Sequence, residues 1–337
     1  MTPRVSVIIP IHNAAAWLAT CLDSILAQSF QEFEIVCIDD ASKDASLSIL
    51  ESYAAKDKRI SVFAFSQNQG SGPARNRGID EAKGEYLIFC DADDVYTPNA
   101  LSLLYQRITE TGAPIGGGNL AFMDHALKSF TGISSTVAST QFCENALVSP
   151  QEYPPLWLPI YHPRYMITAD LLRNNNIRYP NLLRGQDPPF LAHVFCHAGQ
   201  VAVCPEVVYI VRAAEAGKSK LADPQTFIDH VAHFRMGYEV FLEHGERDLA
   251  IFYLGQALAG ILQLHAFLRF SREQRRLLLA ALLPLADSIG EDLFQERYFP
   301  YPVKGGQLKR DVALVTKGTY KFILAKIMER LRKELKL

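Results

Sequence analysis

Four short apolar runs alternate with four longer periodic segments within the first 111 residues, and this alternation restricts the possible folds more than any other feature. The expected strands are Val5–Ile9, Phe33–Ile38, Ile60–Phe65 and Tyr86–Cys90, and the expected helices are Ala14–Gln28, Ala45–Ala55, Gly72–Lys83 and Asn99–Thr111. Runs that are apolar throughout are typical of parallel strands covered on both faces. The pattern predicts an α/β domain with a mostly parallel sheet, in which ligands bind beyond the carboxyl ends of the strands.

The pattern changes twice in the rest of the chain. From about residue 112 to 180 the periodicity loosens, and we interpret Gly116–Gly118 as a turn at a strand edge, because no Gly-Lys-Ser/Thr follows to make a phosphate loop. After Asp223 the apolar spacing is helical again. We predict a domain of residues 1–220, made of the halves 1–111 and 112–220, followed by a helical C-terminal region of residues 221–337.

Composition excludes some classes of protein. The 34 basic and 36 acidic residues give a net charge of −2, which offers no general attraction for nucleic acid. The six cysteines include no CxxC pair and read as thiols in a reducing compartment. No secretory leader and no apolar run of eighteen residues is evident. These features predict a cytoplasmic location.

The last 34 residues are locally basic. Residues 304–337 hold ten Lys or Arg against three acidic residues, a net charge of +7, and Phe322, Ile323, Ile327 and Leu331 fall at helical spacing. One interpretation is an amphipathic helix in peripheral contact with the inner, anionic face of the cytoplasmic membrane. The other is a helix that packs on the protein and keeps its basic face in solvent.

Acidic residues follow two of the expected strands at the point where each strand ends. Asp39–Asp40 follow the second strand and Asp91–Asp94 follow the fourth, so both groups meet at one edge of the sheet. Asp39 and Asp44 are also explained as turn and helix-cap residues, but that explanation does not extend to the second group. Crowded carboxylates indicate a bound cation or polar ligand, and an Asp-x-Asp suits Mn²⁺ or Mg²⁺ bound to a diphosphate.

Several motifs within ninety residues, in the order in which the family has them, resemble the family 2 glycosyltransferases of the GT-A fold. The matching pieces are Val5–Pro10 with Asn13, Cys21-Leu22 with Ser24–Leu26 and Gln28-Ser29, Phe33–Val36 with Asp39-Asp40, Asn68 with Gly70, Ala74–Asn76 with Gly78-Ile79, and Gly84–Tyr86 leading to Asp91–Asp94. The resemblance implies a Rossmann-like GT-A domain for nucleotide-diphospho-sugars. Its first half would bind the nucleotide and its second half would face the acceptor.

The resemblance also implies roles for the residues around the nucleotide. Asp40 stands where the family hydrogen-bonds the imide of uracil, and a carboxylate that faces an N–H donor is a plausible specificity contact. Pro10, His12 and Asn13 would line the pocket for the base. The donor expected from these matches is a UDP-sugar.

Four further residues would serve the diphosphate and the metal. By resemblance Asp93 is a metal ligand, and Asp91 lies near the ribose or the metal's water shell, so it is also a candidate ligand. Arg75 would contact the diphosphate or else hold a structural carboxylate. Arg212, ahead of Lys218–Lys220, would reach the donor from a closing loop or else be an ordinary solvated cation.

The resemblance implies that Asp187 is the catalytic base. This residue lies in Arg184–Phe190, where the usual Glu is replaced by Gln186, and an N-cap role at the start of a helix Pro188–His197 is compatible with catalysis. The expected reaction is inverting transfer of a sugar to a hydroxyl of a glycan or lipid-linked glycan, in polysaccharide or glycolipid assembly. The alternatives are a nucleotidyltransferase and a non-catalytic sugar-binding protein, and the sequence indicates no oligomeric state.

Overall fold

The computed structural model describes residues 2–132, 141–153, 156, 161–213, 224–247, 249–250 and 253. The chain divides into two compact units, Met1–Lys218 and Ser219–Leu337. In the second unit, the helix expected after Asp223 is present as α8 (Pro224–Glu243). The later helical segments expected there and the basic tail 304–337 lie outside the described residues.

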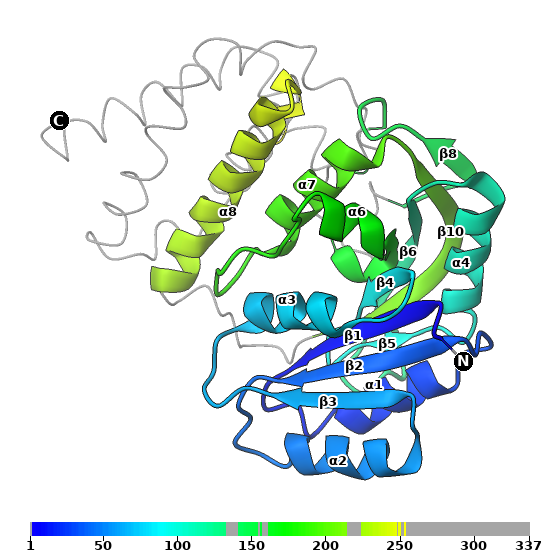
Figure 1. The fold of residues 1–337 in the computed structure, drawn as a ribbon, viewed down its shortest axis with the longest axis vertical. Coiled ribbons are helices and arrows are strands. Elements are labelled where there is room, and N and C mark those ends of the chain that lie inside the picture. Colours follow the sequence, from blue (N-terminus) through cyan, green and yellow to red (C-terminus); the bar gives the residue numbers. More distant parts are fainter. Residues whose placement is uncertain are drawn as a thin grey trace, which may run out of the picture. The chain divides into compact units, whose positions relative to one another are not determined.

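The first unit is built on one mixed sheet, to which the described residues contribute ten strands in the order β3-β2-β1-β4-β9-β6-β10-β5, with β7 on β6 and β8 on β10 (Figure 1). The strands are β1 (Val5–Ile11), β2 (Phe33–Asp39), β3 (Ile60–Ala64), β4 (Tyr86–Phe89), β5 (Val95–Tyr96), β6 (Ile115–Met123), β7 (Phe130–Gly132), β8 (Ala146–Val148), β9 (Tyr165–Thr168) and β10 (Val201–Arg212). The four strands expected from the sequence are β1 to β4, and all pair in parallel. The second half of the sheet is mixed, because β9 runs antiparallel to both β4 and β6.

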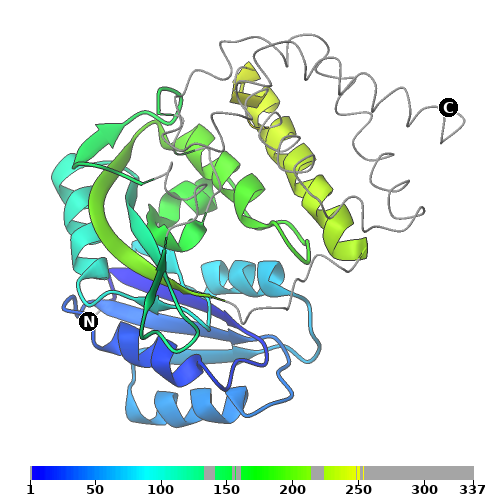
Figure 2. The same cartoon turned by 180° about the vertical axis from the view of Figure 1, so that it is seen from behind.

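Helices cover both faces of this sheet (Figures 1 and 2). They are α1 (Leu18–Leu26), α2 (Ser46–Lys56), α3 (Ser71–Glu81), α4 (Ala100–Thr111), α6 (Ala169–Asn174) and α7 (Asp187–Ala198), with a 3₁₀ turn η2 (His162–Arg164). The sequence therefore predicted α1 to α4 correctly. Because side chains alternate along a strand, odd-numbered residues of β1 such as Ile9 pack with α1, α2 and α4, whereas Ile8 faces α3.

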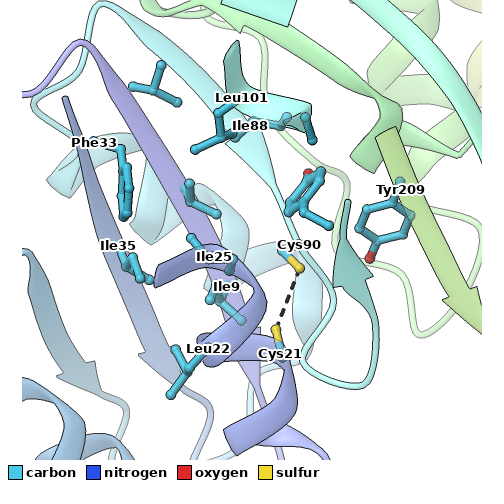
Figure 3. Packing of buried hydrophobic residues seen from close by; sticks show 14 of the residues in the cluster. Ile9, Cys21, Leu22, Ile25, Phe33, Ile35, Ile88, Cys90, Leu101 and Tyr209 are labelled. Atoms are coloured by element: carbon cyan, nitrogen blue, oxygen red, sulfur yellow. Dashed lines mark hydrogen bonds between the residues drawn. The ribbon is translucent and has the colours of Figure 1, made fainter. Parts of the chain in front are cut away.

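The core beneath β1 and β4 is apolar, and its central side chains are fully buried (Figure 3). Ile9, Leu22 and Ile25 are each 0% exposed. Burial of such a side chain stabilises the fold by roughly 1.5–3 kcal/mol. Two free thiols, Cys21 and Cys90, lie here with 3.6 Å between their sulfur atoms. The core thus extends directly under the carboxyl end of β4.

Gly116–Gly118 do not form the turn expected from the sequence, and this prediction was wrong. All three residues are buried inside β6. A Cβ at these positions would lie 2.9 Å from Ile108, 2.8 Å from Tyr165 and 2.5 Å from Val208, respectively. The glycines are required because α4, β9 and β10 approach this strand too closely for any side chain.

Candidate functional site

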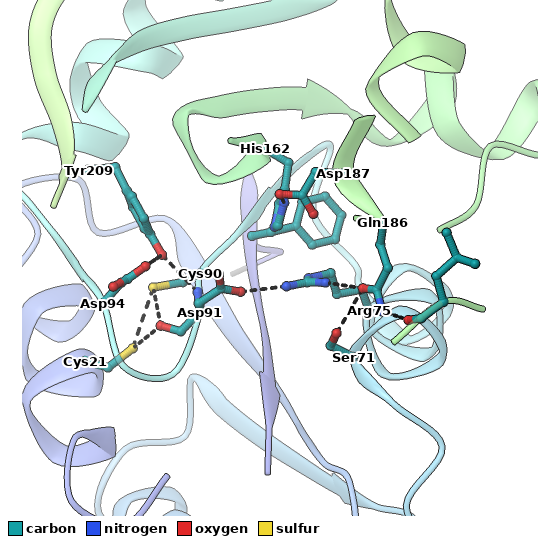
Figure 4. A network of polar contacts seen from close by, with 12 residues as sticks. Cys21, Ser71, Arg75, Cys90, Asp91, Asp94, His162, Gln186, Asp187 and Tyr209 are labelled. Atoms are coloured by element: carbon teal, nitrogen blue, oxygen red, sulfur yellow. Dashed lines mark hydrogen bonds and ion pairs between the residues drawn. The ribbon is translucent and has the colours of Figure 1, made fainter. Parts of the chain in front are cut away.

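The carboxyl ends of β1, β2 and β4 lie at one edge of the sheet, next to the first turns of α3 and α7. This topology places Asp40, after β2, at the same edge as Asp91, after β4. Figure 4 shows Asp91 and Asp187 on either side of Arg75 from α3. Segments far apart in the sequence therefore contribute to a single polar network.

Asp40, after β2, fixes the turn that leads into α3. Its Oδ1 accepts a hydrogen bond from the backbone N–H of Gln69 at 2.7 Å, and its Oδ2 accepts one from Gly70 at 2.8 Å. The carboxylate is buried, with Asp40 2% exposed. Gly70 has a φ of 94°, a conformation that glycine adopts without strain. The observed role of Asp40 is thus to anchor this turn, and its contact with a base stays a prediction.

His12 and Asn13 lie at the end of β1, just beyond the buried Pro10. Nδ1 of His12 lies 2.7 Å from the carbonyl oxygen of Asp40, and Nε2 lies 2.9 Å from Nδ2 of Asn13. Nδ1 also lies 3.0 Å from Nδ2 of Asn68, so the ring contacts three neighbouring residues. Oδ1 of Asn13 accepts from the backbone N–H of Lys43 at 2.8 Å. The loops after β1 and β2 are therefore held together by side chains.

The other two aspartates after β2 accept hydrogen bonds in the loop that leads to α2, whose N-cap is Ala45 rather than Asp44. Oδ2 of Asp39 accepts from the backbone N–H of Ser42 at 3.1 Å. Oδ1 of Asp44 accepts from the backbone N–H of Ser46 at 2.9 Å, at the start of α2. Both residues thus shape the loop after β2.

Arg75 joins the two halves of the site. Its guanidinium donates to Oδ1 of Asp91 through Nη2 and to Oε1 of Gln186 through Nη1, both at 2.7 Å. The Arg75 side chain is 7% exposed and that of Asp91 is 38% exposed. Burial lowers the pKa of Arg75, but the charges of Asp91 and Asp187 outweigh burial and hold this pKa above its ordinary value. Arg75 is therefore a fixed cation between two acidic segments.

Gln186 occupies the N-cap position of α7, one residue before Asp187. Its Oε1 also accepts from the hydroxyl of Ser71 at 2.9 Å, and its Nε2 donates to the carbonyl oxygen of Leu182. The side chain of Gln186 makes no capping hydrogen bond. Asp187 is the first residue of the helix, so the N-cap position considered for it belongs to Gln186. This leaves the Asp187 carboxylate available for other partners.

The principal partner of Asp187 is His162 of η2. Nδ1 of His162 lies 2.8 Å from Oδ2 of Asp187, with the imidazole 1% and the carboxylate 25% exposed. The contact is close in distance but departs from ideal hydrogen-bond alignment, so we describe it as an ion pair. Burial alone raises the pKa of Asp187. His162 and then Arg75 lower this pKa by more than burial raises it, so it lies below that of an ordinary aspartate. Asp187 is thus held in its ionised form.

Asp94 and Tyr209 organise the turn after β4. The Tyr209 hydroxyl accepts from the backbone N–H of Asp91 at 3.0 Å and donates to Oδ2 of Asp94 at 2.8 Å. Oδ1 of Asp94 accepts from the backbone N–H of Arg212 at 2.7 Å. Burial and the charges of Asp91 and Asp93 raise the pKa of Asp94. The third carboxylate of the acidic group therefore supports the backbone of the other two.

Arg212, at the end of β10, packs against the turn from the side of α1. Its Nε donates to the carbonyl oxygen of Asp93 at 2.7 Å, and its guanidinium lies 4.7 Å from the ring centre of Trp17. The segment predicted to close over the donor, Lys218–Lys220, lies outside the described residues. Contact of Arg212 with a diphosphate remains a prediction.

Asp91 and Asp93 have the chemistry that a hard divalent cation requires. Asp93 is exposed on the turn, and Asp91 engages Arg75 through Oδ1, which leaves Oδ2 for another partner. The described residues contain no group of three or more His, Cys, Asp or Glu that could hold a metal ion by itself. Mg²⁺ is commonly held by one or two carboxylates together with substrate phosphates, so this pair fits a metal that arrives with a diphosphate.

Two residues of this site escaped the sequence interpretation. His162 and Tyr209 lie in segments without a motif, and neither neighbours an acidic residue in the sequence. The runs Tyr161–His162 and Val208–Tyr209 are ordinary aromatic and apolar positions of a loop and a strand. No local signal could have identified them, because their partners Asp187 and Asp94 become neighbours only in the folded sheet.

Comparison with solved structures identifies the class of fold. TarS from S. aureus, solved with UDP-GlcNAc, superposes with a TM-score of 0.72 at 22% sequence identity, over 86% of this chain and 83% of the TarS chain. The mannosyltransferase PcManGT from Pyrobaculum calidifontis, solved with GDP-Man and Mn²⁺, gives a TM-score of 0.52 at 18% identity over 88% and 85%. The first unit therefore has the GT-A fold of sugar-nucleotide transferases.

The sequence comparisons agree with the fold. Residues 6–130 match the family model "Glycosyl transferase family 2". Glycosyltransferase GlyG from Streptococcus pneumoniae serotype 4 is 37% identical over 119 residues, which cover 35% of this chain and only 40% of GlyG. The succinoglycan biosynthesis protein ExoO from Rhizobium meliloti is 27% identical over 311 residues, covering 89% and 85%. No helix of the described residues is long and apolar enough to span a membrane.

Proposed function

We propose that this protein transfers a sugar from a uridine diphosphate donor to an acceptor hydroxyl, with inversion at the anomeric carbon. The observation that carries the proposal is the network in which Arg75 connects Asp91, on the expected diphosphate side, to the segment of Asp187. An ionised carboxylate and a fixed cation thus converge on one edge of a GT-A sheet. The match of residues 6–130 to the family 2 glycosyltransferase model favours this reaction over nucleotidyl transfer.

The donor half of the reaction would use Asp91, Asp93 and Arg75. Asp93 and the free oxygen of Asp91 would hold Mn²⁺ or Mg²⁺ with the diphosphate, and the bound cation would neutralise charge on the leaving group. Arg75 is cationic and immobile, so it would stabilise the extra negative charge that the departing diphosphate gains, without reorganisation. The solved complexes of TarS with UDP-GlcNAc and with UDP support uridine diphosphate as the nucleotide.

The acceptor half would use Asp187 as general base. Its lowered pKa keeps the carboxylate ionised at neutral pH, so it can take the proton of an acceptor hydroxyl. The acceptor oxygen forms the new bond to the anomeric carbon while the bond to the diphosphate breaks. The electron pair leaves with the diphosphate and the proton stays on Asp187. One base suffices, because the leaving diphosphate needs no proton when its charge is neutralised.

Titration calorimetry with a panel of nucleotide sugars tests this proposal. We expect UDP-GlcNAc, UDP-glucose or UDP-galactose to bind in the presence of Mn²⁺ and to lose affinity when a chelator replaces the metal. Asp93→Asn should lose the metal-dependent part. Asp80→Asn, which removes an exposed carboxylate on α3 that pairs with Arg178, is the matched control and should bind normally. Tighter binding of GDP-mannose, or equal affinity with and without metal, would contradict the assignment.

We further propose that the acceptor is a glycan of a cell-surface polymer, presented on a lipid at an anionic membrane. The relation to ExoO supports the polymer, and so does the poly(ribitol-phosphate) β-glucosyltransferase of Bacillus spizizenii, 28% identical over 61% of this chain. The net charge of +7 in residues 304–337 supports the membrane. A chain ending at residue 303 should no longer sediment with anionic vesicles but should still use water-soluble acceptors. Unchanged sedimentation of the shortened chain would exclude the tail as the contact.

A further inference from the structure

Behind Asp187, on the side of β4 and η2, lies a buried histidine that no expected role explains. His162 is 1% exposed, and its Nε2 has no hydrogen-bond partner among the described residues. An unpaired buried nitrogen costs stability, so its retention in this position needs a compensating interaction. The short contact from Nδ1 to Oδ2 of Asp187, at 2.8 Å, is the interaction that the structure provides (Figure 4).

The imidazole is held rigidly in place. The ring of Phe89 packs edge-on against it with 5.5 Å between centroids, and the ring of Tyr179 does so at 5.4 Å. Tyr179 is in turn stacked on Phe190 of α7, with centroids 3.8 Å apart. These aromatic contacts fix the ring plane, so the direction in which Nδ1 points is set by the core rather than by solvent.

The backbone of η2 is fixed as well. The Tyr96 hydroxyl donates to the carbonyl oxygen of Pro163 at 2.8 Å, and Nε of Arg164 donates to the carbonyl oxygen of Gly118 at 2.7 Å. His162 therefore sits on a short turn tied to two other strands. A group positioned this firmly can orient a neighbouring carboxylate with little loss of entropy at the moment of reaction.

The position of the proton follows from the distance. A nitrogen and a carboxylate oxygen at 2.8 Å with no proton between them would place two lone pairs against each other. Because the pKa of Asp187 is lowered, the proton belongs to Nδ1 of His162 rather than to the carboxylate. Oδ2 of Asp187 is then engaged by His162.

From this geometry we infer that His162 is a positioning residue, which engages Oδ2 of Asp187, keeps the carboxylate ionised and leaves Oδ1 for the proton of the acceptor hydroxyl. The inference rests on the proposed function, in which Asp187 is the base. His162 itself does not contact the substrate. Its effect on the reaction passes through the orientation and basicity of Asp187 alone.

Several groups face Asp187 and contribute to its titration. They are His162 from η2 through its ring and its backbone N–H, Arg75 from α3, and the phenols Tyr161 and Tyr179. Replacing the imidazole removes one stabilising partner of the carboxylate and leaves Arg75 and the backbone N–H in place. The pKa of Asp187 should therefore rise, and the acid limb of the profile of kcat against pH should move to higher pH.

The test compares three variants of the full chain. His162→Leu removes the donor, His162→Asn keeps an N–H donor near the position of Nδ1, and His197→Leu removes a histidine from the far end of α7 as the control. We expect kcat of His162→Leu to fall ~10- to 100-fold, less than the two to four orders of magnitude expected for loss of the base itself, with a shifted acid limb and an unchanged KM for the donor. His162→Asn should recover part of the loss, and His197→Leu should keep the wild-type profile.

A parallel drop of kcat at every pH, without movement of the acid limb, would mean that His162 only supports the fold. The titration of Asp187 can also be followed without turnover, by NMR of protein labelled at the aspartate carboxyl carbons, with the signal assigned by its loss in Asp187→Asn. If the wild-type protein transferred no sugar from any donor, the proposed function would fail. The NMR comparison of wild type with His162→Asn, or with His162→Leu where it folds, would still decide whether the imidazole controls the pKa of Asp187. An unchanged titration of Asp187 would overturn the inference.

Discussion

Replacing Tyr209 by Phe removes one hydroxyl from the centre of the site and leaves the aromatic ring in place. That hydroxyl accepts from the N–H of Asp91 and donates to Oδ2 of Asp94, while the ring packs against Tyr96 at 5.0 Å between centroids. Tyr209 is 0% exposed, so water cannot replace the lost oxygen without entering the core. The substitution therefore tests how much the turn after β4 depends on these two hydrogen bonds.

The magnitude follows from the two bonds. A buried hydrogen bond to a charged acceptor contributes about 1.5–3 kcal/mol, and one between neutral groups contributes about 0.5–1.5 kcal/mol. Asp94 keeps its bond from the N–H of Arg212, so it is not left without a partner. We expect Tyr209→Phe to lower the free energy of unfolding by about 2–4 kcal/mol.

Urea unfolding followed by circular dichroism provides the measurement, and Tyr53→Phe provides a matched control. Tyr53 donates to Oδ1 of Asp23 at the same distance of 2.8 Å, but at the surface, where we expect a loss below about 1 kcal/mol. Equal losses in the two variants would refute the argument that burial makes the Tyr209 bonds valuable. A loss below about 1 kcal/mol for Tyr209→Phe would show that the turn is held by other contacts.

Three further predictions follow from the site and its support. Asp187→Asn should lower kcat by roughly two to four orders of magnitude with donor affinity unchanged, whereas Asp93→Asn should lose both turnover and donor affinity. Near-normal transfer by a folded Asp187→Asn variant would mean that another residue is the base. Gly78→Ala should lower the free energy of unfolding by about 1–3 kcal/mol, because a Cβ at this position would lie 2.2 Å from Cγ2 of Ile8. An unchanged melting temperature would contradict the close approach of α3 to β1. Because the pKa of Asp187 is lower in the folded protein, its ionisation adds stability above about pH 3.9, and this stability is lost as the pH falls through the folded pKa. The urea midpoints of wild type and Asp187→Asn should therefore converge in acid. A constant gap between them would exclude the ion pair with His162.

Local patterns in the sequence were sufficient for the first half of the fold. Runs such as Val5–Ile9, apolar apart from Ser6, favour strands covered on both sides, and the segments between them have helical periodicity. The aspartates that follow β2 and β4 were expected at one edge of the sheet, because parallel strands end on the same side. Asp187 was expected at the start of a helix, where α7 begins. Each of these features is encoded by residues a few positions apart.

The alternatives that the sequence left open were decided by contacts between distant segments. Arg75 was expected to touch the donor or a structural carboxylate, and its partners are Asp91 and Gln186, the latter 111 positions away. Gly116–Gly118 have the composition of a turn but lie inside a strand, because α4, β9 and β10 leave no room for a Cβ. Periodicity describes one element at a time and cannot predict which neighbour will crowd it.

The amino-acid sequence by itself thus determined the order of strands and helices in the first 111 residues and the positions of the acidic groups. The tertiary structure decided which charges meet. His162 faces Asp187 because the antiparallel strand β9 is inserted between β4 and β6, which carries η2 to the side of α7. The energy of an ion pair depends on a distance of a few ångströms between side chains, and that distance is set by the packing of the whole sheet.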